Sequence, residues 1–289
     1  MLKKKNLQKQ LKRFQSRNHK KEGDFILPLF LYYKIMQTKN ILIGPKLGDL
    51  FHMLTVPKYL YYFYGIKSNI YITEKFDKFS TGLEDTYHSL YQIIISQSFT
   101  ESFQIYNDEK IDYDLNLFRT NGMWCTRPFW AIFLHTAFPN CPTIPRNFKV
   151  LNWKKNDKYK DYLIVHRKPL FDFNSFVEKQ YLDLFEQYDK KLFITYDEKL
   201  YDDFPLKNKI DLLVCKNLEE QLTIINSAKM NLFNATAPIT MASVLNAPRI
   251  GELGKWINTL YGSDHLLFDN VEFFDEFDIL TPEPKSLKK

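Results

Sequence analysis

The chain has 289 residues, of which 45% are hydrophobic and 26% charged, so its composition is that of a globular protein and excludes a largely disordered chain. This length favours two small α/β domains, because single hydrophobic cores stop growing at about 250–300 residues. No run reaches the roughly 18–20 apolar residues of a membrane-spanning helix, and no apolar signal-peptide segment follows the first charges. We therefore expect a cytoplasmic protein that is at most peripheral to a membrane.

The net charge of +6 is concentrated at the amino terminus. Because the rest of the chain is nearly neutral, the sequence disfavours nucleic acid as a partner of the folded part. We expect residues 1–22 to form a disordered, solvated tail; the alternative is a basic arm that contacts anionic lipid or nucleic acid. The cations of this segment, opposed by the single acid Glu22, are Lys3, Lys4, Lys5, Lys9, Lys12, Arg13, Arg17, Lys20 and Lys21.

Cys125, Cys141 and Cys215 are odd in number, widely separated and without CxxC spacing. This pattern argues against both a disulfide framework and a zinc site. We expect reduced, partly buried thiols.

The first half begins with a βαβ unit. Residues 39–44 predict a buried parallel strand, residues 49–64 a helix that ends at Gly65, and residues 69–73 a second strand. Residues 89–96 and 111–118 predict further strands, and residues 124–138 an aromatic helix.

A polar stretch at residues 140–157, which begins beside Pro139, predicts an interdomain linker. The alternation then restarts and ends with a last strand at residues 249–253. Two doubly wound halves across a cleft are the GT-B outline, with domains at residues 23–145 and 146–289. We expect the apolar segment 264–280 to pack and to cross back to the first domain. The remaining elements predicted in the second half are strands at 161–166, 191–195, 211–215 and 230–233, and helices at 174–188, 218–228 and 239–245.

Two of the predicted turns are glycine-containing, although the chain holds only nine glycines. Gly44 and Gly48 occupy the first strand-to-helix turn, and Gly251 and Gly254 lie at the end of the last predicted strand. Ligands of open α/β sheets bind at such turns. Because the first turn lacks GxGxxG and phosphate-loop spacing, the sequence does not support an ordinary dinucleotide or ATP site there.

Three segments together resemble the bacterial family 9 glycosyltransferases, the ADP-heptose:lipopolysaccharide heptosyltransferases. Gly48, Asp49 and His52 match that family's Gly-Asp-x-x-His turn after a strand, residues 112–117 match its "YDLVIDL" strand, and residues 225–254 match its "DTGPMHLA" helix region. The resemblance covers roughly residues 39–254. It implies a GT-B fold with an N-terminal acceptor domain and a C-terminal nucleotide-sugar donor domain, and a hexosyl- or heptosyltransferase activity.

The donor segment departs from the family pattern at two positions. Ala235 stands where the family has Asp, with Asn234 one place earlier, and Thr240 stands where it has His. Since those positions contact the donor in the family, the resemblance does not carry over the identity of the donor. The helix start at Thr236, Thr240 and Met241 is still expected to hold a diphosphate through its hydroxyls and backbone N–H groups.

Inverting glycosyl transfer requires a base for the acceptor hydroxyl and positive charge for the nucleoside diphosphate that leaves. Asp49 is the candidate base, as the resemblance also implies; the alternative is that it only caps the following helix. His52 is a candidate for orienting Asp49 or the acceptor, and the alternative is a packed or solvated histidine.

Arg167 and Lys168 follow the first strand of the second half and are the candidate cations for the diphosphate, the alternative being ordinary surface charge. Glu252 is a candidate acceptor for a base or ribose hydroxyl; the alternative is a solvated acid.

Asp112 and Asp114 form a DxD pattern, which in GT-A enzymes holds a metal ion. No GT-A order of elements surrounds it, and His88, His135 and His265 have no partners at metal-ligand spacing. We therefore expect no cofactor and no metal, with the nucleotide sugar as a substrate.

The sequence thus predicts a metal-independent glycosyltransferase that acts on a glycan, lipid-linked or protein-linked acceptor, with possible membrane contact through the basic tail. Two other functional classes are considered. One is a catalytically degenerate GT-B binding protein, suggested by the altered donor segment, and the other is a Rossmann-type protein that binds nucleic acid through its tail.

Overall fold

The structure, a computed structural model, describes residues 38–120, 129–138, 144, 148–170, 173, 175–254, 271–274 and 277–280. The predicted basic tail, Cys125, Cys141 and His265 lie outside the described residues. No helix within these ranges is long and apolar enough to cross a bilayer.

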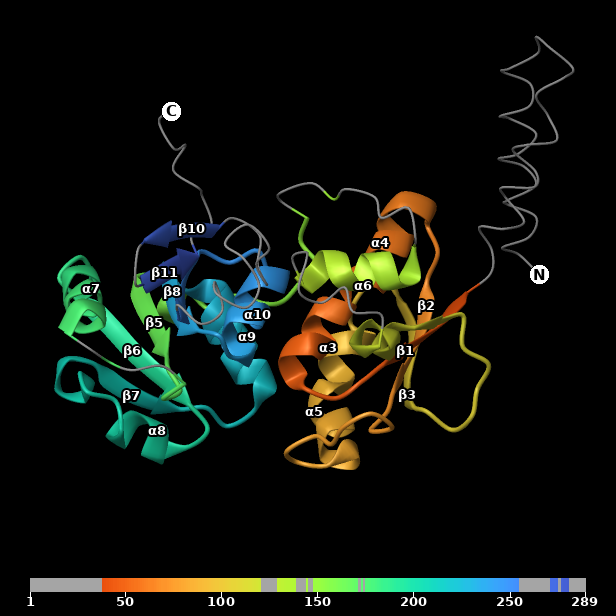
Figure 1. The fold of residues 1–289 in the computed structure, drawn as a ribbon, viewed down its shortest axis with the longest axis horizontal. Coiled ribbons are helices and arrows are strands. Elements are labelled where there is room, and N and C mark those ends of the chain that lie inside the picture. The colour runs from red at the N-terminus through yellow and green to blue at the C-terminus, as the bar shows by residue number, and fades with distance from the viewer. Residues whose placement is uncertain are drawn as a thin grey trace, which may run out of the picture. The chain divides into compact units, whose positions relative to one another are not determined.

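The first half is built on a parallel four-stranded sheet in the order β3-β2-β1-β4 (Figure 1). Ile41 of β1 pairs with Ile70 of β2, and both are fully buried. Strands with near-continuous buried apolar residues are typical of a parallel sheet that is covered on both faces. The strands are β1 Lys39–Ile43, β2 Ser68–Ile72, β3 Thr100–Ile105 and β4 Tyr113–Asp114.

The helix predicted at residues 49–64 is two helices, α3 Leu47–Met53 and α4 Thr55–Tyr64. The chain restarts its helix at Thr55, which places Pro57 in a first turn, where its missing N–H is not needed. Gly65 ends α4 in the left-handed conformation, φ 67°, as predicted.

Two strand predictions in this half are wrong. Residues 89–96 belong almost entirely to α5 Leu83–Ile95, because the buried Thr86, Leu90, Ile93 and Ile94 recur at helical spacing despite the β-branched run. Of residues 111–118, only the two residues of β4 are strand. The side chain of Asp114 accepts from the Asn116 backbone N–H and starts a 3-10 helix, η1 Leu115–Arg119. The aromatic helix is described as α6 Phe129–Ala137.

The second half contains a seven-stranded sheet in the order β10-β11-β9-β8-β5-β6-β7. Five strands are parallel and close to their predicted positions, whereas β11 pairs antiparallel with β9 and β10 pairs antiparallel with β11. The strand at β9 is therefore not the last, and the described part of the C-terminal segment extends this sheet instead of crossing back to the first half. The strands are β5 Tyr162–His166, β6 Lys190–Thr195, β7 Asp211–Val214, β8 Met230–Asn234, β9 Arg249–Gly254, β10 Val271–Phe274 and β11 Phe277–Leu280.

The helices of this half begin at recognisable caps. The Asn217 side chain accepts from the Glu220 N–H at the start of α9, and Pro238 stands in the first turn of α10. Asp197 caps the short α8, which the sequence analysis missed because five residues show no periodicity. The helices are α7 Ser175–Phe185, α8 Glu198–Asp202, α9 Leu218–Ser227 and α10 Ala237–Val244.

One buried apolar cluster contains residues of both halves, among them Ile43 of β1, Met53 of α3, Ile225 of α9 and Met241 of α10. A second cluster, which includes Tyr181 and Phe193, lies within the second half alone. Helices α3 and α10 therefore meet through packed side chains, and α10 is central to the assembly of the two halves (Figure 1).

The segment that joins the halves is bonded to both of them. Asn152 exchanges two hydrogen bonds with the Gln97 side chain, at 2.9 and 3.1 Å, while the N–H groups of Val150 and Leu151 donate to the Val244 carbonyl. Trp153 Nε1 donates to Thr223 Oγ1 at 3.0 Å. The described part of the predicted linker is thus fixed to α5, α9 and α10. The domain boundary at residues 145 and 146 stays a prediction.

Candidate functional site

Each sheet reverses its strand order once in a way that creates a binding crevice. In the first sheet β1 lies between β2 and β4, and in the second β5 lies between β6 and β8. Connections leave such a strand pair toward opposite faces of the sheet, so a crevice forms at the carboxyl ends. The residues that follow β1, β4, β5 and β8 are therefore the candidates for contact with a ligand.

At the first reversal, Asp49 and Arg119 form an ion pair. Arg119 Nη2, in η1 after β4, lies 2.7 Å from Asp49 Oδ2 in the first turn of α3, and also donates to the Pro45 carbonyl at 3.2 Å. These contacts hold the Asp49 carboxylate in place beside the crevice. The residue at the cap of α3 is Lys46, so Asp49 is not the helix cap that the alternative interpretation required.

The Asp49 side chain is 15% exposed. Burial raises the pKa of Asp49 above its ordinary value, because the loss of solvation outweighs the attraction of Arg119 and Lys46. A carboxylate with a raised pKa is a stronger base than a solvated one. This is the property that proton abstraction from a hydroxyl requires.

Gly48 brings the start of α3 against the start of α10. A Cβ atom at Gly48 would lie 3.5 Å from Thr240 Oγ1 and 3.8 Å from Ala237 Cα. Two of the three sequence segments that carried the family resemblance, more than 180 residues apart, are therefore in direct contact.

The start of α10 offers fewer donors than an ordinary helix terminus. The Thr236 N–H donates to the Asn234 carbonyl at 2.6 Å, Pro238 has no N–H, and the Ile239 N–H donates to the Thr236 carbonyl at 3.2 Å. In this described turn, the Ala237 N–H remains for an anion, whereas the half-buried Thr236 hydroxyl donates to the Asn234 carbonyl at 3.2 Å. Thr240 and Met241 are both buried, and Thr240 Oγ1 lies at the contact with Gly48.

Lys168 follows β5, and its side chain is exposed. Its backbone is held by the Asn234 amide, which donates through Nδ2 to the Lys168 carbonyl at 2.6 Å and accepts the Lys168 N–H at 3.3 Å. Lys168 thus stands next to the start of α10 with its ammonium group in solvent.

Arg167 and Glu252 form an ion pair that is buried and not solvated. Arg167 Nε lies 3.1 and 2.9 Å from the two Glu252 oxygens, and Nη2 lies 2.9 Å from Oε1. The Tyr181 hydroxyl donates to Glu252 Oε2 at 2.6 Å, and the Arg167 guanidinium lies over the Phe173 ring. The side chains are 5% and 2% exposed, so both surface-charge alternatives are wrong. This geometry indicates that the Arg167–Glu252 ion pair links the end of β5 to β9.

His52 and His166 are buried. Burial, with the charge of Arg249 adding to it, lowers the pKa of His52 to about 3. Burial lowers the pKa of His166 to about 4, although its bond to the Ile194 carbonyl acts in the opposite direction. Both rings are therefore neutral near pH 7, and His52 is the packed histidine of the alternative interpretation.

These two histidines predict a loss of stability in acid. Below pH 6.5 the two histidines of the unfolded chain bind protons, whereas the folded rings stay neutral until about pH 3 for His52 and about pH 4 for His166. The free energy of unfolding therefore falls by up to about 1.4 kcal/mol for each ring and each pH unit as the pH decreases. In urea titrations between pH 6 and 4.5, we expect His166→Gln to reduce this slope. The matched change at the exposed His88 should leave the slope unchanged, and equal slopes in all three proteins would contradict the assignment.

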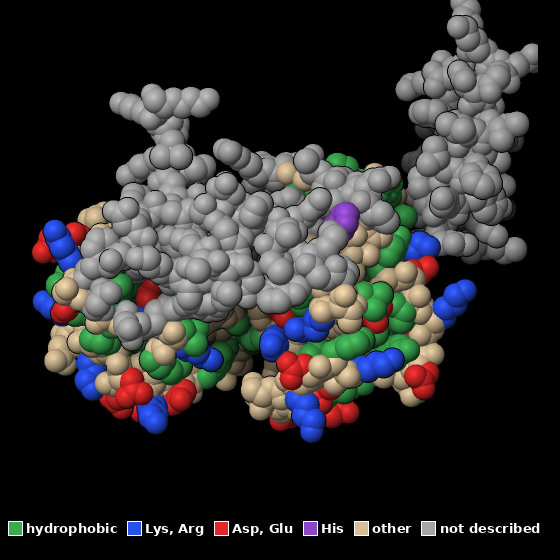
Figure 2. All heavy atoms as spheres, in the orientation of Figure 1, with side chains coloured by type: hydrophobic (Ala, Val, Ile, Leu, Met, Phe, Trp, Pro, Cys, Tyr) green, Lys and Arg blue, Asp and Glu red, His purple; other side chains and the backbone are tan. Residues whose placement is uncertain are grey.

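A cavity of about 560 Å³ opens beside Lys46, three residues before Asp49. Figure 2 shows charged side chains of both signs scattered over the visible described surface. The cavity lining differs, because its charged members within the described residues are all lysines. The lining comes from the ends of β1, β2, β6 and β7 and from α5 and α9: Lys46, Leu47, Lys78, Phe79, Ser80, Thr81, Thr86, Ser89, Leu90, Tyr196, Lys216, Asn217 and Leu218.

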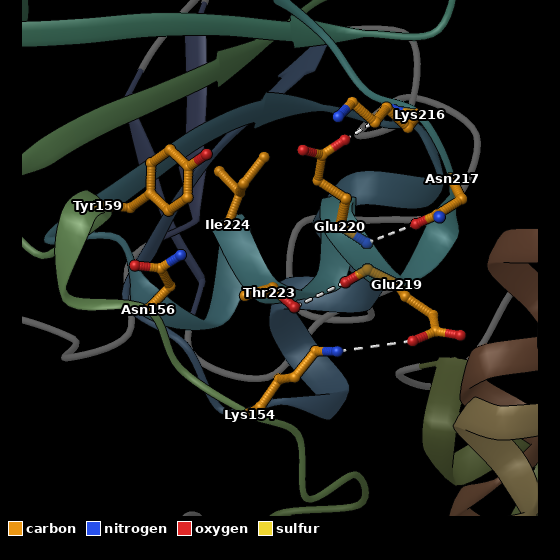
Figure 3. A pocket seen from close by; sticks show the side chains of 9 residues that line it. All are labelled: Lys154, Asn156, Tyr159, Lys216, Asn217, Glu219, Glu220, Thr223 and Ile224. Atoms are coloured by element: carbon orange, nitrogen blue, oxygen red, sulfur yellow. Dashed lines mark hydrogen bonds and ion pairs between the residues drawn. The ribbon is translucent and has the colours of Figure 1, made fainter.

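A second hollow, of about 330 Å³, adjoins the first at Lys216 and Asn217. Figure 3 shows an ion pair within the hollow itself, between Lys154 and Glu219. Lys154 lies 3.6 Å from Glu219, and the Lys216 N–H donates to Glu220. These pairings support a structural role for this face of α9.

Asp112 and Asp114 do not act together. Asp112 binds Lys39 and the Asn40 N–H at the beginning of β1, whereas Asp114 binds the backbone and the amide of Asn116. Within the described ranges, no three His, Cys, Asp or Glu residues are grouped as metal ligands. The positions of the two carboxylates therefore do not support the GT-A interpretation.

Sequence reasoning missed Arg119 and Asn234 as site residues. Arg119 follows the resemblance segment at 112–117, but its role depends on β4 lying next to β1. Asn234 was noted only as the neighbour of Ala235. Neither residue could be assigned before the strand order was known.

No protein-family profile matches the chain, and no curated protein sequence matches it significantly. Solved structures do match. The family 9 glycosyl transferase of Veillonella parvula is 12% identical with a TM-score of 0.54, over 83% of this chain and 89% of that one. The E. coli heptosyltransferase WaaC with ADP is 12% identical with a TM-score of 0.50, over 79% and 92%.

The E. coli ADP-heptose lps heptosyltransferase II is 10% identical with a TM-score of 0.50, over 86% of this chain and 96% of that one. These similarities confirm the predicted fold, two parallel-sheet α/β halves of GT-B type. At identities of 10–12% they show the fold alone.

Proposed function

We propose that the protein is a glycosyltransferase that moves a sugar from a nucleoside diphosphate to an acceptor hydroxyl, with inversion and without a metal ion. The proposal rests on one observation. Asp49 is held by Arg119 and follows Gly48, and Gly48 packs against the start of α10. A base and an anion-binding turn then face the same crevice.

In the proposed reaction, the acceptor oxygen attacks the anomeric carbon of the donor and its proton passes to Asp49. The bond between the anomeric carbon and the β-phosphate oxygen breaks, and the nucleoside diphosphate leaves with the electron pair. Lys168 and the Ala237 N–H stabilise the charge that develops on the diphosphate. Arg119 keeps the Asp49 carboxylate directed to the crevice.

The nucleotide-sugar donor is supported by the structural neighbours, since the WaaC structure contains ADP. Here Ala235 cannot supply a carboxylate and Thr240 is buried, so donor contacts differ from those that the resemblance implied. We assign the donor to the crevice between Lys168 and Thr236. Arg167 is not assigned to the donor, because Glu252 holds it in the buried ion pair.

The acceptor is assigned to the cavity beside Lys46. A volume of about 560 Å³ accommodates one or two sugar units, and its serine and threonine hydroxyls and Tyr196 are groups that bind sugars. The lysine-only charge of the lining favours an acidic glycan, whether lipid-linked or protein-linked. Membrane contact through residues 1–22 would bring a lipid-linked acceptor to this cavity.

The experiment is a release assay with a panel of nucleotide sugars, with and without a chelator. We expect one donor class to yield its nucleoside diphosphate at the same rate in both conditions. A strict metal requirement would contradict the metal-free mechanism, and nucleotide binding without any release would favour the degenerate binding protein.

A further inference from the structure

Asn234, the last residue of β8, joins the two segments of the donor crevice. Its side chain is fully buried, and its amide makes two hydrogen bonds to the backbone of Lys168. Its own carbonyl accepts the Thr236 N–H at 2.6 Å and the Thr236 hydroxyl at 3.2 Å. One residue thus contacts the backbone after β5 and the turn before α10.

The amide is the side chain that fits both bonds to Lys168. A backbone carbonyl needs a donor and a backbone N–H needs an acceptor, and a carboxamide supplies one of each. The two bonds fix where the backbone at Lys168 leaves the sheet, and with it the point from which the exposed side chain extends. Asn234 also pairs in register with Glu252, so it lies directly beside the buried Arg167 ion pair.

We propose that Asn234 is a positioning residue for the donor diphosphate, acting through Lys168. The assignment rests on the proposed function, because it takes the crevice between Lys168 and α10 as the donor site. Asn234 does not replace the carboxylate that the resemblance expects at position 235, since its amide is directed at the Lys168 backbone. It acts on the ligand through the placement of the lysine.

Asn231 provides a matched control on the same strand. It is also fully buried, and its Nδ2 makes two hydrogen bonds to backbone carbonyls, of Ile225 at 3.1 Å and Pro248 at 2.8 Å. It lies three residues earlier, away from the crevice. The change of either asparagine to alanine removes the same atoms and leaves a buried cavity of similar size.

The test compares Asn234→Ala with Asn231→Ala in urea unfolding and in calorimetric titration with ADP, UDP and GDP. We expect both variants to lose stability. Only Asn234→Ala should lose about tenfold in affinity for the nucleoside diphosphate that the wild type binds, with kcat at saturating donor changed much less than KM. Equal affinities in the two variants would overturn the proposal.

A double-mutant cycle with Lys168→Ala separates positioning from a general loosening of the crevice. If Asn234 acts through Lys168, its change to alanine should cost less than about twofold in affinity once the lysine is absent. A full tenfold loss in that background would contradict the mechanism. If the wild type bound none of the three nucleotides, the proposed function itself would fail, and this assignment with it.

Discussion

Replacement of Asp49 by asparagine should slow sugar transfer at least a hundredfold and leave the protein folded and able to bind its nucleotide. The side chain keeps its size, but it can no longer take the proton of the acceptor hydroxyl, and general-base catalysis contributes about 10²–10⁴-fold. Because Lys46 occupies the cap of α3, the change removes no helix cap. Single-turnover kinetics with the active donor, together with calorimetry of nucleotide binding, measure both effects.

Asp77→Asn is the matched control for this change. Asp77 is a more exposed carboxylate that lies 3.5 Å from Lys46, so its loss changes the local charge by the same amount without touching the proposed base. We expect a transfer rate within about threefold of the wild type, as for most surface charge changes. Transfer by Asp49→Asn at a similar rate would show that Asp49 is not the base.

The second large effect is expected at Arg167, as a loss of folding stability. Arg167→Ala leaves the Glu252 carboxylate buried, with the Tyr181 hydroxyl as its remaining donor in the part of the chain that the structure describes. Removal of one partner of a buried ion pair costs about 3–5 kcal/mol, a large part of the 5–15 kcal/mol that typically stabilises a domain. Urea unfolding at pH 7 should show this loss directly.

The double variant Arg167→Met with Glu252→Gln tests the cause. Removal of both charges avoids the unpaired carboxylate, so most of the lost stability should return. The folded fraction of either variant should bind nucleotide with an affinity close to that of the wild type. If Arg167→Ala instead lost tenfold in affinity at unchanged stability, Arg167 would be the diphosphate ligand that the sequence first indicated.

Local patterns in the sequence were sufficient to predict the positions of most of the parallel strands. The apolar run before Gly44 and the glycine at position 65 are both patterns within a few residues, and both were predicted correctly. The strand predicted at residues 89–96 was wrong. The three β-branched residues Ile93, Ile94 and Ile95 favour a strand, whereas the longer spacing of the buried residues is helical.

The site was harder to predict from the sequence because the residues that contact each other there are far apart along the chain. Arg119 and Asp49 are 70 residues apart, and Arg167 and Glu252 are 85 residues apart. Charged residues at the ends of strands can be identified in the sequence, but their partners follow from the strand order. The burial of His52 likewise depends on the packing of α3 in the core that both halves share.

The most direct test of the central claim is a crystal structure with a bound nucleoside diphosphate, paired with titration of Lys168→Ala and of the exposed control Lys179→Ala. The account predicts a diphosphate between the Lys168 ammonium group and the Ala237 N–H, and an affinity at least about tenfold lower for Lys168→Ala alone, since a charged hydrogen bond contributes about 1.5–3 kcal/mol. A diphosphate bound elsewhere, or equal affinities in the two variants, would contradict it.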